Sequence, residues 1–143
     1  MKKTLCALTL SAMTLTACAG FTASDISVKE LSSHSWMSDV KVNESCEIPP
    51  LITFTADGKI SGEPGCNNLI GEYKIGKNGE FRFENLGLTR KLCAKPYMQQ
   101  ERAFMAMIEA TRFAEKDGDK IVFLNQDKKP LGAIVPEKAG ACL

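Results

Sequence analysis

Short stretches of hydrophobic and β-branched residues, separated by turn residues, follow one another through the middle of the chain. Residues 51–55 (LITFT) and 80–84 (EFRFE) have strand patterns, and in the second of these phenylalanine alternates with charged residues. Asp57-Gly58 and Asn78-Gly79 are dipeptides that adopt the positive φ of tight hairpin turns. The pattern predicts consecutive antiparallel hairpins, with further strands at 31–42, 59–62, 69–75, 121–124 and 131–135.

A single amphipathic helix is predicted after Cys93, where Pro96 suits the first helical turn. Apolar residues recur at helical spacing on one face, and polar residues lie opposite. The apolar face comprises Tyr97, Phe104, Met107, Ile108 and Thr111, and the polar face Gln99, Arg102 and Glu109. Since the helix interrupts a series of strands without βαβ alternation, a doubly wound nucleotide-binding fold is excluded. Trp36, in the first strand, and Tyr73 are the rings expected in the core.

The first 27 residues have the pattern of a targeting segment and a tether. Lys2 and Lys3 precede an apolar stretch, residues 5–15, that is too short to span a membrane. Leu15-Thr16-Ala17-Cys18 resembles a bacterial lipobox, which predicts cleavage before Cys18 and acylation of that residue. We interpret residues 1–17 as a lipoprotein signal peptide, 18–27 as a lipidated tether and 28–143 as the domain. The alternative is an ordinary signal peptide with Cys18 unmodified.

Length and charge limit the classes of function. The 143 residues are enough for one domain, and losing Lys2 and Lys3 with the signal peptide takes the formal charge from +1 to −1. A nearly neutral chain gives no electrostatic reason to expect nucleic-acid binding or attraction to an anionic membrane. Ala19, rather than aspartate, follows the lipobox cysteine. By analogy with enteric bacteria, this predicts a lipid anchor in the outer membrane, with the domain facing the periplasm. We also expect a monomer.

Four cysteines remain once Cys6 leaves with the signal peptide and Cys18 takes lipid. An even number in a small exported domain is typical of a disulfide framework, and four cysteines allow three connectivities. We favour Cys66–Cys93 and, by exclusion, Cys46–Cys142. The alternatives are a zinc site or a cysteine nucleophile. No Cys-x-x-Cys spacing is present and the only histidine is His34, so we expect no metal, no cofactor and no catalytic cysteine.

The residues before and after Cys66 are rich in turn formers. Gly62, Pro64 and Gly65 interrupt the strand pattern, and Asn67-Asn68 follows the cysteine. Asparagine side chains hydrogen-bond nearby backbone groups, so turn chemistry is one interpretation of this pair and a polar ligand site is the other. Carboxylate pairs such as Asp117 and Asp119 accompany a turn glycine, and nothing in the chain combines a base, a nucleophile and an oxyanion site.

These residues resemble the META domain family, the HslJ-like bacterial lipoproteins. The family pattern has an early tryptophan, an apolar strand, a Gly-x-x-Gly-Cys-Asn segment, a Gly-x-Tyr, an alternating strand, a threonine four residues before a cysteine, and a helix with glutamate then phenylalanine. In this chain the pattern falls on Trp36, 51–54, Gly62, Gly65, Cys66, Asn67, Gly71, Tyr73, 81–86, Thr89, Cys93, Glu101 and Phe104. Cys46 and Cys142 are additions to the pattern.

The resemblance implies an α+β fold, in which a strongly curved, barrel-like antiparallel sheet of about seven to eight strands packs on one α-helix. It links the chain to the cell envelope, to heat-shock or stress responses and to antibiotic tolerance. It supplies no catalytic residues, and it implies structural roles for Asn67 and the Cys66–Cys93 pair.

Two functional hypotheses follow. The first is a non-enzymatic envelope lipoprotein that binds or supports another envelope component, which predicts an exposed apolar or concave patch. The second is an inhibitor of a hydrolytic enzyme such as lysozyme, in which residues 61–68 form a rigid loop that enters the enzyme cleft.

Overall fold

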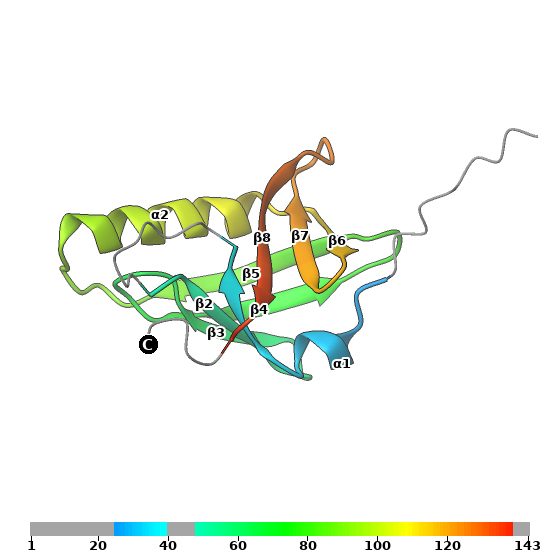
Figure 1. Ribbon diagram of the computed structural model, residues 1–143, viewed down its shortest axis with the longest axis horizontal. Coiled ribbons are helices and arrows are strands. Elements are labelled where there is room, and N and C mark those ends of the chain that lie inside the picture. Colours follow the sequence, from blue (N-terminus) through cyan, green and yellow to red (C-terminus); the bar gives the residue numbers. More distant parts are fainter. Residues whose placement is uncertain (1–24, 40–47, 139–143) are drawn as a thin grey trace, which may run out of the picture.

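The chain forms an antiparallel sheet with one long helix packed against it (Figure 1). The structure is a computed structural model that describes residues 25–39 and 48–138. In chain order the elements are α1 (Val28–Leu31), β1 (Ser35–Ser38), β2 (Leu51–Phe54), β3 (Lys59–Glu63), β4 (Leu69–Ile75), β5 (Phe81–Leu88), α2 (Lys95–Ala110), β6 (Phe113–Asp117), β7 (Lys120–Leu124) and β8 (Pro130–Pro136).

The eight strands have the order β5-β4-β3-β2-β1-β8-β7-β6. The last strand, β8, pairs with the first, so that Trp36 lies opposite Pro136 in the centre of the sheet. The two edge strands, β5 and β6, approach each other at one end through an isolated bridge between Glu80 and Phe113. There the backbone N–H of Phe81 donates to the carbonyl of Arg112 at 2.9 Å. The sheet is therefore curled into a half-barrel.

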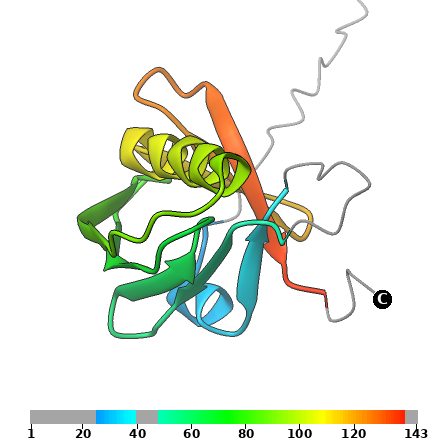
Figure 2. The same cartoon turned by 90° about the vertical axis from the view of Figure 1, so that its left-hand side faces the viewer.

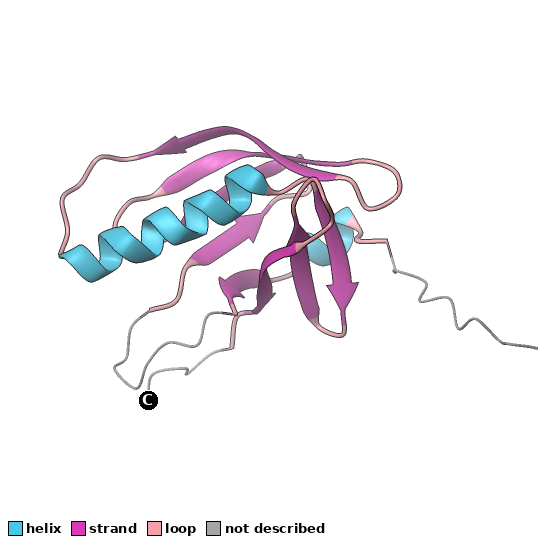
Figure 3. Cartoon of the chain, turned by 90° about the horizontal axis from the view of Figure 1, so that it is seen from above, coloured by secondary structure: helices cyan, strands magenta, loops and turns pink. Residues whose placement is uncertain are grey.

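Helix α2 connects the two edge strands and lies within the curve of the sheet. Figure 2 looks nearly along the helix axis, with the strands curving around it, and Figure 3 shows the same arrangement from above. Phe104, Met105 and Ile108 turn from the helix into the core. This architecture confirms the predicted α+β fold of a strongly curved antiparallel sheet with one main helix.

Aromatic rings from four strands form the centre of the core. Their centroids lie 5.2–6.4 Å apart, mostly edge to face. The cluster comprises Phe54, Tyr73, Phe81, Phe83 and Phe123. The Tyr73 hydroxyl donates to the Thr55 carbonyl at 2.8 Å. Burial, together with the nearby charge of Asp57, raises the pKa of Tyr73 above its ordinary value of 10.0.

The predicted hairpin turns are confirmed by their backbone geometry. Gly58 has φ 85°, and Asn78 and Gly79 have φ 57° and 78°, the left-handed values that Asp-Gly and Asn-Gly turns need. The strands at 51–55, 59–62, 69–75, 80–84, 121–124 and 131–135 are also found, within one or two residues at most ends, although β5 continues to Leu88.

The first predicted strand, residues 31–42, is wrong at its beginning. Leu31 ends the short helix α1, which Ser27 caps by accepting a hydrogen bond from the N–H of Glu30 at 3.2 Å. The chain then turns so that Trp36 Nε1 donates to the Leu31 carbonyl at 2.9 Å. Only Ser35–Ser38 form the strand, with Trp36 buried as predicted, and residues 40–42 lie outside the described residues. Ile26 is already part of the core.

The predicted apolar face of α2 also needs correction. Tyr97 is 45% exposed, because the first turn of the helix extends beyond the strand ends (Figure 1). Glu101, one turn further on, is buried. Strand β6, which pairs with β7, was not among the strands that the sequence pattern predicted.

Candidate functional site

The segment 64–68, between β3 and β4, packs directly on the first turns of α2. Gly65 makes this contact possible. A Cβ atom at this position would lie 2.4 Å from the Tyr97 carbonyl oxygen and 2.9 Å from the Glu101 nitrogen, both of which are backbone atoms. Only glycine allows the two backbones to approach so closely.

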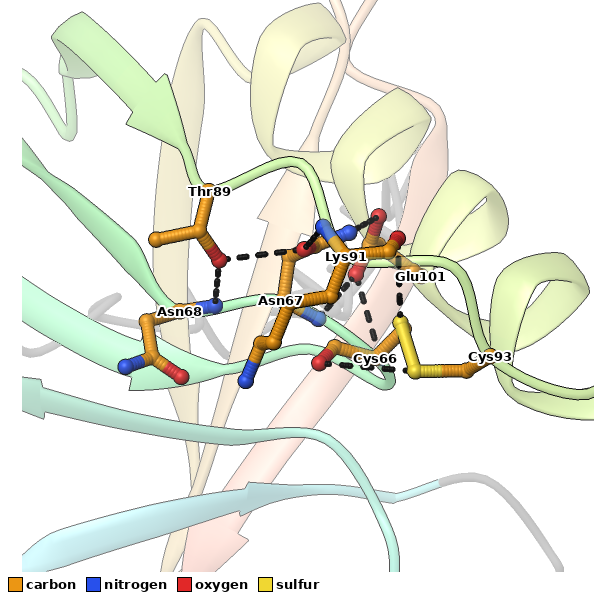
Figure 4. Close-up of a disulfide and its surroundings, with 7 residues drawn as sticks. All are labelled: Cys66, Asn67, Asn68, Thr89, Lys91, Cys93 and Glu101. Carbon is orange, nitrogen blue, oxygen red and sulfur yellow. Dashed lines mark hydrogen bonds between the residues drawn. A yellow bond between two sulfur atoms is a disulfide. The ribbon is translucent and has the colours of Figure 1, made fainter.

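The Glu101 carboxylate binds the segment through three hydrogen bonds (Figure 4). Its Oε2 accepts hydrogen bonds from the N–H groups of Cys66 at 3.1 Å and Asn67 at 2.6 Å. Its Oε1 accepts from Asn67 Nδ2 at 3.0 Å. The residue is only 6% exposed, and a carboxylate in such a place is tolerated when hydrogen-bond donors surround it. These donors all come from the segment itself.

Asn67 continues this network to the other side. Its Oδ1 accepts from the Thr89 hydroxyl at 3.0 Å and from the backbone N–H of Lys91 at 2.6 Å. The Thr89 oxygen in turn accepts from the N–H of Asn68 at 3.0 Å. Glu101, Asn67 and Thr89 therefore join α2, segment 64–68 and the segment after β5 through side chains whose polar atoms face one another (Figure 4).

A disulfide bond between Cys66 and Cys93 joins segment 64–68 covalently to the segment between β5 and α2, with a Cα–Cα distance of 5.8 Å. The structure thus contains the first of the two predicted disulfides. Cys66 is buried and Cys93 is exposed. The sulfur of Cys66 lies 3.4 Å from the Lys91 carbonyl, but a disulfide sulfur carries no hydrogen, so this is a packing contact. Cys18, Cys46 and Cys142 lie outside the described residues, as does the proposed signal peptide.

The predicted ligand residues differ in their surroundings. Asn67 is buried, and its side chain is bonded to Glu101, Thr89 and Lys91. Asn68 is exposed, and among the described residues only its backbone is hydrogen-bonded. In segment 61–68, the proposed inhibitory loop, residues 61–63 belong to β3, and Pro64, Cys66 and Asn67 are buried. That segment is packed into the domain.

Sequence reasoning did not propose Glu101, Thr89 or Lys91 as site residues. Glu101 precedes Phe104 and Ile108 by three and seven positions, and an acidic residue on the apolar face of a helix is a signal that could have identified it. Thr89 and Glu101 also belong to the family pattern. Lys91 takes part through its backbone, which no side-chain pattern reveals.

Other candidate chemical groups are not brought together. His34 is exposed and lies edge-on to Trp36, with ring centroids 5.9 Å apart. Asp117 and Asp119 flank Gly118, which has φ 63° in an exposed turn. Within residues 25–39 and 48–138, no three His, Cys, Asp or Glu side chains are grouped as a metal site would require.

An open pocket of about 420 Å³ lies at the other end of the molecule, around the β4–β5 turn. Half of its lining residues belong to the β4–β5 turn, and none of them is a serine, threonine, cysteine or histidine. The lining residues are Asp25, Ile26, Ile75, Gly76, Lys77, Asn78, Gly79, Glu80, Phe81 and Ala114. None of the described helices is long and apolar enough to cross a membrane.

The surface next to the disulfide is exposed and cationic. We call residues 90–97 (RKLCAKPY) the cationic segment, and every residue in it is exposed. Leu92 is 96% exposed, which is unusual for a leucine. Ile48, 64% exposed, lies near the same end of α2, since its carbonyl accepts a hydrogen bond from Gln100 at 3.0 Å.

The curled sheet, the helix within it and the disulfide-fastened Cys-Asn segment together define a small α+β domain. The family model of the META domain matches residues 28–137, and the chain belongs to this family. It is not a known enzyme family.

Solved structures share the fold. An NMR structure of a protein from Burkholderia xenovorans is 20% identical with a TM-score of 0.61, covering 78% of this chain and 86% of that one. A second NMR structure is 24% identical with a TM-score of 0.60, covering 78% and 95%. A crystal structure of a DUF4847 family protein from Bacteroides vulgatus is 16% identical with a TM-score of 0.51, covering 76% and 94%. No curated protein matches the chain significantly.

Proposed function

We propose that this protein is a non-enzymatic lipoprotein of the bacterial cell envelope, and that it binds another envelope component through the disulfide-fastened end of its domain. One observation supports this most strongly. Glu101, Asn67 and Thr89, which belong to the family pattern, bond to one another and to the backbone rather than facing an open cavity. Their hydrogen bonds hold the backbone at this end of the domain in one conformation.

The part of the chain that these bonds hold in place includes the exposed cationic segment. Asn67 holds the backbone of Lys91, and Cys66 holds Cys93, so the cationic segment is fastened at two points to the body of the domain. A rigid exposed surface loses little conformational entropy on binding, which favours a recognition role. The sequence supports placement in the envelope through the lipobox at Cys18 and the tether 18–27. The resemblance to stress-linked envelope proteins supports a contribution to survival of heat or antibiotic stress.

A complementation experiment tests this proposal. A strain lacking the gene is exposed to heat and to antibiotics, and survival is measured after the full-length chain or a variant is restored. His34→Gln and Asn68→Ala, adjusted to the wild-type amount of folded protein, should both restore tolerance, because no chemical step depends on either side chain. Cys18→Ala should fail, because the predicted anchor is lost.

Mass spectrometry of the amino-terminal peptide accompanies the survival assay and should show an acylated Cys18. Loss of tolerance with His34→Gln at equal folded abundance would argue for a chemical role of the imidazole. An unmodified Cys18 in the mature protein would contradict the lipoprotein assignment.

A further inference from the structure

The cationic segment combines three charges with two exposed apolar side chains on one short stretch. From these features we infer that the segment is a contact site for the surface of an anionic phospholipid bilayer. The inference deepens the proposed function, on which it rests, by naming the component that the disulfide-fastened end binds.

Charge is the first part of the argument. Arg90, Lys91 and Lys95 are exposed, and the segment contains no acidic residue. None of the ion pairs between described residues involves these three cations. The nearly neutral total charge of the chain therefore conceals a local excess of positive charge. Clustered Lys and Arg next to a membrane are attracted by the negative potential of anionic lipids.

Apolar exposure is the second part. Leu92 projects between these cations with 96% of its surface exposed, and Tyr97 is 45% exposed one helical turn beyond the disulfide. Leucine gains free energy on leaving water, and tyrosine is favoured at the level of the lipid headgroups, where its ring and hydroxyl face different media. Cationic residues next to an aliphatic and an aromatic side chain are typical of segments that bind at the membrane interface.

The exposure of the whole segment favours a bilayer as the anionic partner. Every residue from 90 to 97 is exposed, so its charged and apolar side chains are all open to an extended surface. A bilayer needs no cleft, because a projecting leucine enters between headgroups. The bonds from Asn67 to Lys91 and from Cys66 to Cys93 hold the projection in place.

The test measures binding to large unilamellar vesicles. Residues 19–143 are exported behind a cleavable signal that carries no lipidation site, so that neither the signal peptide nor an acyl chain contributes to binding. This piece contains the whole sheet and core, which begin at Ile26. Phosphatidylcholine vesicles are compared with vesicles that also contain phosphatidylglycerol. We expect binding to the anionic vesicles only, weakening as salt is raised.

Matched variants locate the contact. Each cation near an anionic surface strengthens binding about fivefold, so Arg90→Gln/Lys91→Gln/Lys95→Gln should weaken it on the order of a hundredfold at low salt. Glutamine leaves the Lys91 backbone donor in place. The control Lys29→Gln/Lys77→Gln/Lys129→Gln changes the net charge equally at exposed positions elsewhere and should change binding little. Leu92→Ser should weaken binding about tenfold, whereas Ile70→Ser, at a residue 66% exposed on β4, should not.

Three outcomes would overturn the inference. These are equal binding to both kinds of vesicle, no binding to either, and equal losses from the two triple variants. A second experiment distinguishes failure of the membrane inference from failure of the proposed function. A photo-cross-linking amino acid is placed at position 92, and its cross-linked partners are identified in living cells. Cross-links to lipid support the inference. Cross-links to a protein overturn it and leave the envelope-binding role intact, provided that the chain is acylated and restores tolerance.

Discussion

Glu101 shows how one side chain determines the form of this end of the molecule. A buried carboxylate is costly unless donors satisfy it, and here two backbone N–H groups and the Asn67 amide do so. Helix α2 thus fixes the path of a segment that is 34 residues earlier in the chain. The network explains why a glycine, a cysteine, an asparagine, a threonine and a glutamate recur together in the family pattern.

Replacing this carboxylate by an amide tests the network. In Glu101→Gln, the NH₂ group must face donors from Asn67 or Cys66, so we expect the free energy of unfolding to fall by about 1–3 kcal/mol. Urea denaturation followed by circular dichroism measures the change. Glu109→Gln, on the exposed face of the same helix, should change stability by less than about 0.5 kcal/mol. Equal effects of the two substitutions would refute the network's contribution.

The sequence predicted part of this arrangement. The structural roles of Asn67 and of the Cys66–Cys93 pair were implied by the family resemblance, whereas the cysteine count alone left three connectivities open. The interpretation of Asn67 as local turn chemistry was wrong, because its side chain bonds residues at least 22 positions away. Glu101 was hidden because helical periodicity was read from apolar residues alone. Tyr97 was assigned to the core because periodicity does not say where a helix extends beyond the sheet that covers it.

Among the elements, hairpins were the easiest to predict and α1 the hardest. Asp57-Gly58 and Asn78-Gly79 specify their turns through positive φ, so the strands on either side were found together. Helix α1 has four residues, too few for one amphipathic repeat, and its apolar Leu31 was joined to the following strand. The packing of α2 on segment 64–68 was also invisible, because it depends on backbone contact at Gly65.

That contact predicts a large effect for a single methyl group. In Gly65→Ala the new Cβ would meet backbone atoms of α2 that cannot rotate away, so we expect a loss of about 1–3 kcal/mol in the free energy of unfolding. Thermal and urea unfolding measure it. Gly87→Ala is the control, since a Cβ there meets only side-chain atoms of Ile70, at 3.4 Å or more. Gly65→Ala with unchanged stability would show that segment and helix can separate freely.

The Cys66–Cys93 disulfide contributes to the stability of the whole molecule. The Cys66–Cys93 bond closes a loop with a sequence separation of 27, which corresponds to roughly 3–4 kcal/mol in the chain-entropy model. We predict that non-reducing peptide mapping of the mature protein finds this bond and a second one between Cys46 and Cys142, with no free thiol. A reactive thiol at Cys66 or Cys93 would contradict this prediction and would reopen the question of redox or metal chemistry.

The order of strands could not be derived from local pattern. Hairpin signals predicted neighbours in sequence, and β2 to β5 follow one another in the sheet as expected. The pairing of β1 with β8 depends on two segments at opposite ends of the domain, and nothing in either strand specifies the other. Only the resemblance to a known family implied that the sheet curves around the helix.

The pairing of Trp36 with Pro136 has a consequence for how the protein is made. As synthesis proceeds from the amino terminus, β1 obtains β2 as one neighbour early and waits for the other until almost the entire domain has emerged. Contacts between such distant parts of a chain form slowly, because a long loop must close first. We therefore expect a chain that has not yet reached β8 to lack a complete core, because one edge of β1 is still without its partner strand.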